Sequence, residues 1–381
     1  MTVIICELNP LHKGHEFLIK EAAKDDSVIL VMSGNFTQRG SAAVYDKYTR
    51  GKAAILTGAD LVLELPFPWC SAGAADFARA GVTIAKMAGA DRLVFGSGSG
   101  DGELLRRAGA AFADGNFDKA FEDAAKKDPT EGAAKLREMI LSEMFSTDEA
   151  KILSNPNDIL GIEYNRYAHL LGGIECVPVK RVEGGDVASA TRIREIIENE
   201  GADAAKIHMP SSVYDVFGSA SHTPESALYD IERLLLRLDR CKFETTAECE
   251  GGLGYRLRGI AGECRDGAEL LRLAATKKYT DARIRRALLY AVLGITRDMV
   301  RESPLYTTVL GIGREGGAIL KKIKKSATIE VLTKAADHDR LTDRARAQFD
   351  MTAAADRLYT ALMPAGVPEE YFLSVTPYIE K

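Results

Sequence analysis

Short apolar runs alternate with amphipathic stretches over roughly the first 200 residues of the chain. Helical periodicity marks the longer stretches, for example over 46–58 and 74–87. The apolar runs between them predict buried strands at 3–6, 27–32, 61–65, 92–95 and 176–179. This alternation predicts a Rossmann-like α/β fold with a doubly wound parallel sheet. Because such sheets bind ligands beyond the carboxyl ends of their strands, we expect the site in the turns that follow these runs.

The pattern changes twice along the chain. Residues from about 101 to 150 are charged and helical, which indicates a helical insertion. From about 206 onward strand signals nearly vanish, and helical spacing dominates, as in 231–238 and 284–292. We therefore predict an α/β domain over 1–205 and an α-helical domain over 206–381.

Composition narrows the class of protein. The chain has 381 residues, of which 46% are hydrophobic and 28% charged, as in ordinary globular proteins. No stretch is long and apolar enough for a membrane span, and the chain begins directly in a strand, so we expect no membrane partner and no signal peptide. The six cysteines are scattered without a CxxC pair, which favours reduced thiols in the cytoplasm over a structural zinc site.

Charge is unevenly distributed, although the net charge is only -5. The segment 277–325 contains twelve Lys and Arg residues but four Asp and Glu. Such an excess is typical of a surface that binds nucleic acid, although runs of charge are often only solvated helix faces. An aromatic residue lies among the cations, so the expected RNA-binding residues are Lys277, Lys278, Tyr279, Arg283, Arg285 and Arg286.

The turn after the first strand carries the strongest chemical signal. Asn9-Pro10 ends the strand, and a helix begins near Gly14. His12 and His15 are three residues apart and share one face of the first turn, where free N–H groups and the helix dipole attract phosphate. Two imidazoles there could stabilise charge on an α-phosphate under attack, which points to nucleotidyl transfer. Gly14 would let the nucleotide approach the backbone.

Other polar turns follow the predicted strands. The segment 33–40 could bind phosphate or a second substrate, or be a plain loop, and the cations of 46–50 could face ATP or solvent. Gly96, Gly98 and Gly100 permit close approach of a ligand, but a lone glycine loop is weak evidence. Asn155 could be an ordinary N-cap. Ser189 could be one too, or could bind phosphate with the helix start that follows it.

Together these segments resemble the bacterial tRNA(Met) cytidine acetate ligases over nearly the whole chain. The family often has Tyr, Phe and Asn where this chain has Leu8, Leu11 and Lys13, and we expect an acidic residue where it has Gly98. The matching stretches are Glu7–His15, Met32–Gly40, Asp46–Arg50, Glu64–Phe67, Phe95–Ser97, Pro156–Gly161, Ala188–Arg194, Thr276–Thr280 and Val309–Gly311.

The resemblance implies a nucleotidyltransferase-like catalytic domain over 1–205, a tRNA-binding domain over 206–381 and a two-step reaction. Acetate attacks the α-phosphate of ATP to give acetyl-adenylate. The exocyclic amine of the wobble cytidine in elongator tRNA(Met) then takes the acetyl group. Magnesium is expected with the triphosphate, but its ligands are unknown.

The resemblance also implies roles for single residues. His12 and His15 would stabilise the transition state. Independently of the resemblance, Arg39 and Lys47 are candidates to neutralise acetate or the acyl oxyanion, because the adenylate would be held over the carboxyl ends of the strands. Ser189, Thr191 and Arg192 would hold pyrophosphate, while Asn157 and Arg181 contact ATP. The full nucleotide set is Ile5, Cys6, Glu7, Leu8, Asn9, Pro10, Leu11, His12, Lys13, Gly14, His15, Gly96, Gly98, Gly100, Asn157, Arg181, Ser189, Thr191 and Arg192.

Two other functions fit part of the sequence. An adenylyltransferase acting on a small phosphorylated metabolite would explain the first 200 residues but not the basic helices. A nucleotide- and tRNA-binding protein without chemistry would bind ATP and release no pyrophosphate.

Overall fold

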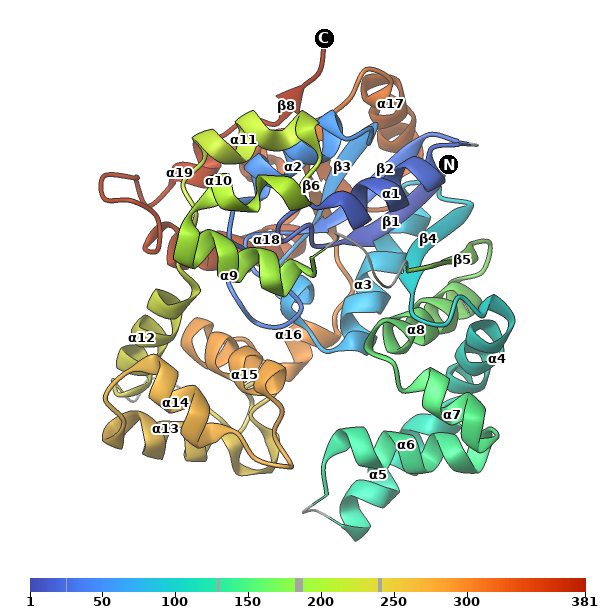
Figure 1. Cartoon of the computed structure of the whole chain (residues 1–381), viewed down its shortest axis with the longest axis vertical. Coiled ribbons are helices and arrows are strands. Elements are labelled where there is room, and N and C mark those ends of the chain that lie inside the picture. Colours follow the sequence, from blue (N-terminus) through green and yellow to red (C-terminus); the bar gives the residue numbers. More distant parts are fainter. Residues whose placement is uncertain (25, 129–130, 182–187, 239–241) are drawn as a thin grey trace.

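A mixed, mostly parallel sheet forms the centre of the molecule (Figure 1). The computed structural model describes residues 1–24, 26–128, 131–181, 188–238 and 242–381. Within these ranges the sheet order is β5-β4-β1-β2-β3-β6-β7, and β8 pairs with β6. The strands are β1 (Thr2–Cys6), β2 (Val28–Ser33), β3 (Leu61–Leu65), β4 (Arg92–Ser97), β5 (Glu175–Lys180), β6 (Tyr306–Ile312), β7 (Glu330–Leu332) and β8 (Tyr378–Ile379).

The first five strands are parallel and confirm the predicted α/β fold. β1 and β2 run in register from Thr2 beside Val28 to Cys6 beside Met32, and both strands are almost wholly buried. Burial on both faces explains why these segments read as continuous apolar runs. The turns after β1, β2, β4 and β5 therefore meet at one edge of the sheet.

Helices cover both faces of the sheet, as right-handed crossovers between parallel strands require (Figure 1). One face carries α1 (Lys13–Ala22) and α2 (Lys47–Leu56), and the other α3 (Ala74–Met87) and α8 (Pro156–Leu171). Beyond α2 lie α9 (Ala190–Glu200), α10 (Ala202–Ala205) and α11 (Tyr214–Ser219). The predicted insertion is helical and comprises α4 (Gly102–Ala113), α5 (Asn116–Lys127), α6 (Ala133–Met144) and α7 (Thr147–Leu153).

A compact helical cluster follows, with a hydrophobic core of its own. It contains α12 (Glu225–Leu236), α13 (Leu253–Glu263), α14 (Gly267–Ala274), α15 (Asp281–Leu293) and α16 (Arg297–Arg301). Leu253, Leu257, Leu270 and Ile284 are among the buried residues of this core. We call α12–α16 the helical cluster.

The expectation that 206–381 is entirely α-helical is wrong beyond the helical cluster. The chain returns to the sheet as β6, which pairs antiparallel with β3, and β7 pairs with β6. All seven residues of β6 are buried, and Gly51 of α2 packs closely on its Leu310 carbonyl. The last helices, α17 (Gly316–Ser326), α18 (Asp343–Thr360) and α19 (Tyr371–Ser374), therefore pack around the same sheet.

Hydrogen bonds between the two parts anchor the helical cluster to the α/β part. The Trp69 indole N–H donates to the carbonyls of Val300 and Glu302, each at 2.9 Å. The Tyr290 hydroxyl donates to the Pro68 carbonyl at 3.0 Å. In the part of the chain that the structure describes, no helix is long and apolar enough to cross a membrane.

Candidate functional site

Two stacked imidazoles begin α1 at the carboxyl edge of the sheet. His12 is the N-cap, and its Nδ1 accepts a hydrogen bond from the Gly14 amide at 3.0 Å. His15 Nδ1 accepts from the His12 amide at 3.3 Å, and the ring centroids are 3.8 Å apart. The prediction that the two histidines share a face is confirmed. Because both Nδ1 atoms accept, each neutral ring carries its proton on Nε2, which is left as a donor.

Both histidines are neutral at physiological pH. Burial, with the nearby charges of Arg181 and His208, lowers the pKa of His12 to about 4. Burial, with the charges of His12 and Arg181, holds the pKa of His15 well below its usual range. The pair therefore offers N–H dipoles to a ligand rather than two full positive charges.

Arg181 and Asn157, which the family resemblance gives as ATP contacts, lie at the end of β5 and the start of α8. Arg181 is the first residue after β5 and is exposed. Its Nη1 donates to Asn157 Oδ1 at 3.1 Å, which joins the end of β5 to the start of α8. Because the charge of Arg181 lowers the pKa of both histidines, it supplies the positive field at this side of the site.

The N–H groups of the glycine loop after β4 form hydrogen bonds within the protein. Asp158 is wholly buried and accepts from the amides of Gly98 at 3.1 Å and Ser99 at 3.0 Å, and from the Ser97 hydroxyl. The Gly100 amide donates to Ser97 Oγ at 2.8 Å. These amides are occupied, so Gly98 and Gly100 do not offer free N–H donors to phosphate.

The start of α9 approaches the β1–α1 turn through Arg194. Its Nη1 donates to the Asn9 carbonyl at 2.8 Å. Ser189 is the N-cap of α9, and its Oγ accepts from the Arg192 amide at 3.2 Å. The Arg192 side chain is 61% exposed and pairs with Glu195. Arg194 was not among the predicted site residues, although it belongs to the same short motif.

The loop over residues 33–40 closes the other side of the turn. The Gln38 amide donates to Glu7 Oε1 at 2.6 Å. Burial raises the pKa of Glu7, although the Gln38 amide and the charge of Arg39 oppose the shift. Arg39 itself is exposed at the tip of this loop. Asn9 is also linked to the segment that follows this loop, because its Oδ1 accepts a hydrogen bond from the Val44 amide at 2.8 Å.

Lys47 has a different environment from the one expected of an acetate-binding residue. Its Nζ lies 2.8 Å from Glu64 Oε1 and 2.7 Å from Asp356 Oδ2, and only 3% of its side chain is exposed. Asp356 Oδ1 also accepts from Asn35 Nδ2 at 2.8 Å. This arrangement gives the ammonium group two carboxylate partners inside the protein and joins α18 to the 33–40 loop.

The expected RNA-binding residues differ in exposure and in whether they form ion pairs within the protein. Lys277 is exposed and Lys278 half-exposed, but Tyr279 is buried and its hydroxyl donates to the Gly251 carbonyl. Arg283 pairs with Glu248 and Glu250, at 3.6 and 3.5 Å. Arg286 pairs with Glu248, and the Arg285 guanidinium lies 5.7 Å from the centre of the Tyr229 ring.

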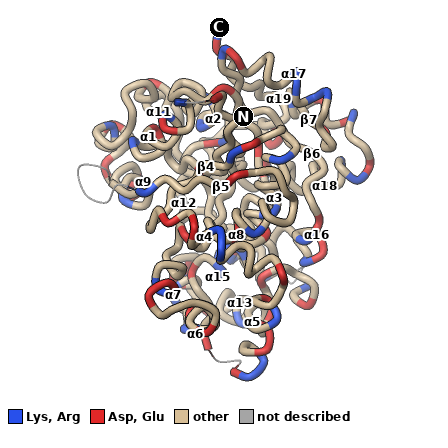
Figure 2. Tube along the Cα trace, turned by 90° about the vertical axis from the view of Figure 1, so that its right-hand side faces the viewer, with Lys and Arg blue, Asp and Glu red and all other residues tan. Residues whose placement is uncertain are grey.

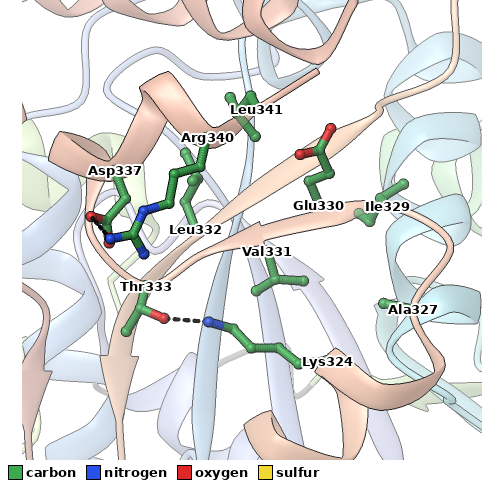
Figure 3. A pocket seen from close by; sticks show the side chains of 10 residues that line it. All are labelled: Lys324, Ala327, Ile329, Glu330, Val331, Leu332, Thr333, Asp337, Arg340 and Leu341. Carbon is green, nitrogen blue, oxygen red and sulfur yellow. Dashed lines mark hydrogen bonds and ion pairs between the residues drawn. The ribbon is translucent and has the colours of Figure 1, made fainter.

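The basic segment also divides into two surfaces. α17 lies near the top of the molecule, beside the sheet, whereas α15 lies below the sheet in the helical cluster (Figures 1 and 2). Beside α17 is a hollow of about 380 Å³ that is lined by α17, β7 and the segment 335–340 (Figure 3). Its polar groups are largely paired with one another, as Lys324 Nζ is with Thr333 Oγ1 at 2.6 Å. Because β7 is the far edge of the sheet from β4 and β5, this hollow is separate from the histidine site.

Within the described ranges, no group of three or more His, Cys, Asp or Glu side chains could hold a metal ion.

Comparison with known proteins places this geometry in a family. The model of the HIGH nucleotidyl transferase family matches residues 1–371. The chain belongs to that family. It is also 32% identical to the tRNA(Met) cytidine acetate ligase of Caldanaerobacter subterraneus, over 94% of both chains. It is 29% identical to the Clostridium perfringens enzyme of the same name, over 98% of both chains. The resemblance found in the sequence is thus confirmed.

Solved structures of the same HIGH nucleotidyl transferase type share the whole fold. The Thermotoga maritima protein TmcAL, crystallised with alpha-thio ATP, is 28% identical and superposes with a TM-score of 0.92. The match covers 100% of this chain and 99% of that one. An apo form of TmcAL gives the same TM-score at 27% identity.

The buried histidines predict a loss of stability in acid. The folded-state pKa of His12 is depressed, so its contribution is present above the unfolded pKa of about 6.5 and is lost as pH falls toward 4. Between pH 7 and 5 we expect wild type to lose about 2 kcal/mol more unfolding free energy than His12→Asn, which keeps an N-cap acceptor. Urea denaturation at both pH values measures this, and equal losses would contradict it.

The buried ion network predicts that Lys47 is needed for folding. Lys47→Met leaves Glu64 and Asp356 buried without their cation, so the free energy of unfolding should fall by about 3–5 kcal/mol. Lys52→Met, on the exposed face of the same helix, should cost less than about 1 kcal/mol. Urea denaturation compares the two. A Lys47→Met protein of normal stability that lacks activity would instead assign Lys47 to the chemistry.

Proposed function

We propose that this protein is an ATP-dependent ligase that activates acetate and acetylates a cytidine of tRNA. The acceptor we propose is the exocyclic amine of the wobble cytidine in elongator tRNA(Met). The observation that carries this proposal is the stacked, neutral histidine pair at the start of α1, within a fold shared with an alpha-thio ATP complex. The names of the relatives supply the acceptor.

The first step joins acetate to the α-phosphate of ATP. A carboxylate oxygen forms the new P–O bond, and the bond to the β-phosphate breaks, so acetyl-adenylate and pyrophosphate result. The Nε2–H groups of His12 and His15 would donate to the α-phosphate oxygens as negative charge gathers on them. Such donors are already oriented by their Nδ1 hydrogen bonds and need little rearrangement during the reaction.

The positive side chains around the turn fit the triphosphate. Arg181, held by Asn157, would contact ATP beside the histidines. The N-terminus of α9, with Ser189, Thr191 and Arg192, would receive the outgoing pyrophosphate, since helix N-termini bind anions. Magnesium would accompany the triphosphate and help to neutralise its charge.

In the second step the cytidine amine attacks the acetyl carbon. The N–C bond forms, the bond from carbon to the phosphate oxygen breaks, AMP leaves with the electron pair, and the nitrogen gives up a proton. Adenylation is needed because acetate alone has no adequate leaving group. An unpaired anticodon base can be turned out into a pocket, which a base in a duplex cannot do as easily. Arg39, exposed on the 33–40 loop, would neutralise the acyl oxyanion.

One experiment tests the whole proposal. The protein is incubated with labelled acetate and ATP, with and without total tRNA, and the RNA is digested and searched for labelled acetylcytidine. Acetylcytidine that depends on ATP, acetate and tRNA supports the proposal. Pyrophosphate release that needs a phosphorylated metabolite instead of acetate would favour a metabolite adenylyltransferase. ATP binding without any pyrophosphate release would favour a non-catalytic protein.

The histidine pair predicts a specific loss in the first step. His12→Asn retains the N-cap hydrogen bond but removes the Nε2–H donor, and His15→Ala removes the second ring. Each should lower acetate-dependent pyrophosphate release by about a hundredfold or more. Circular dichroism checks that the variants are folded. Normal pyrophosphate release by either variant would remove the central claim.

The free cations predict where RNA docks. The double variant Lys277→Glu/Lys278→Glu should bind tRNA more weakly and with a smaller dependence on salt, because fewer counterions are released. Acetyl-adenylate formation should persist, since the ATP site lies in the α/β part. Lys321→Glu/Lys322→Glu on α17, beside the sheet, is the matched control. Filter binding across a salt series measures the tRNA affinity of both double variants. Equal losses of affinity in the two would mean that RNA docks elsewhere.

A further inference from the structure

The RNA-binding candidate helix α15 is in backbone contact with the 33–40 loop. Gly40 has φ of +76°, and a Cβ at this position would lie 2.5 Å from the Arg286 amide nitrogen and 2.7 Å from the Arg285 carbonyl carbon. Only glycine fits so close an approach. The loop that carries Arg39 therefore ends directly on the helix, and the two cannot move independently.

Arg286 reinforces this contact with its side chain. Its Nε donates to Glu248 Oε1 at 2.7 Å, and its Nη1 donates to the Gln38 carbonyl at 3.4 Å. Only 11% of the Arg286 side chain is exposed. Two of its three nitrogen atoms, Nε and Nη1, therefore already have partners inside the protein, whereas Lys277 is exposed.

The hydrogen bonds continue from Gln38 to the strand that carries the histidine turn. The Gln38 amide donates to Glu7 Oε1 at 2.6 Å, and the Gln38 carbonyl accepts from Arg286. Both backbone polar groups of Gln38 are therefore held. Arg39 follows next in the chain and is exposed toward solvent. The position of Arg39 is thus set by residues on either side, Gln38 and Gly40, which both contact α15.

We propose that Arg286 is a positioning residue for acetyl transfer. It is not the RNA contact that the sequence suggested. It holds the Gln38–Arg39–Gly40 turn in place beside the end of β1, so that the Arg39 guanidinium is presented to the acyl group. This inference rests on the proposed function for its reaction, but the placement of the turn is a property of the free protein.

Two measurements separate a positioning residue from an RNA contact. Arg286→Met keeps most of the side-chain volume and removes the hydrogen bonds. In single turnovers from preformed acetyl-adenylate, we expect its transfer rate to fall about tenfold or more, because small displacements of a reacting group are costly. Its tRNA affinity and salt dependence should remain those of wild type. Lys277→Met, the contrasting variant, should show weaker, less salt-dependent tRNA binding.

Limited trypsin digestion tests the placement of the turn without any assay of activity. Trypsin cleaves after arginine, and Arg39 is exposed, so cleavage there reports how firmly the turn is held. Cleavage after Arg39 should be several times faster in Arg286→Met than in wild type or Lys277→Met. Glu248→Gln, which weakens the ion pair but keeps the shape, should accelerate it less.

The outcomes distinguish this inference from the proposed function. Unchanged cleavage at Arg39 in Arg286→Met would overturn the positioning role whatever reaction the protein catalyses. So would reduced tRNA affinity with normal transfer, which would make Arg286 an RNA contact. A wild-type protein that forms no acetylcytidine, yet shows the faster cleavage in Arg286→Met, would refute the proposed function and retain the structural role.

Discussion

The buried guanidinium of Arg50 joins the ends of two central strands and so fixes the site. The carboxyl ends of β1 and β2 leave carbonyl groups beyond the last ladder hydrogen bonds, and buried carbonyls need donors. Arg50, which is wholly buried, donates to the carbonyls of Glu7 at 2.6 Å and Ser33 at 3.1 Å, and also to that of Gly34. Its Nε donates to the Tyr45 carbonyl at 2.9 Å, just before its own helix. One planar cation thus sets the distance between the histidine turn and the 33–40 loop, a geometry that lysine could not reproduce.

Neutral histidines suit a site that must accept a polyanion and release it. Burial disfavours the charged imidazole, so the pair offers oriented N–H dipoles while Arg181 supplies positive charge at the rim. Two buried imidazolium rings stacked at 3.8 Å would repel each other strongly. Donors that stay in place through the reaction favour the transition state without a change of protonation, provided that the pH stays above the pKa of His12.

Much of the fold could be predicted from the sequence, because strands buried on both faces and amphipathic helices leave strong periodic signals. The strand 61–65 and the helix 74–87 were predicted with the bounds that the structure shows. β6 was missed although its residues are β-branched and apolar, because its partner β3 lies over 240 residues earlier and no local pattern records that pairing. The shared face of His12 and His15 was predictable, because it follows from their spacing at the start of a helix. The pairing of Lys47 with Asp356 was not, since it depends on how α18 returns to the sheet.

The return of the chain as β6 also fixes how the helical cluster is attached to the α/β part. The helical cluster leaves the α/β part after α11 and is tied back by Trp69 and Tyr290 before β6 pairs with β3. Both ends of the cluster are therefore anchored, and α15 is pressed against Gly40 at the carboxyl edge of the sheet. A tRNA-binding surface attached by a single flexible linker could deliver its substrate anywhere. Because the helical cluster is anchored at both ends and α15 shares a backbone contact with the 33–40 loop, the proposed RNA-binding surface has a fixed position relative to the proposed site, and the topology of the sheet helps to set that position.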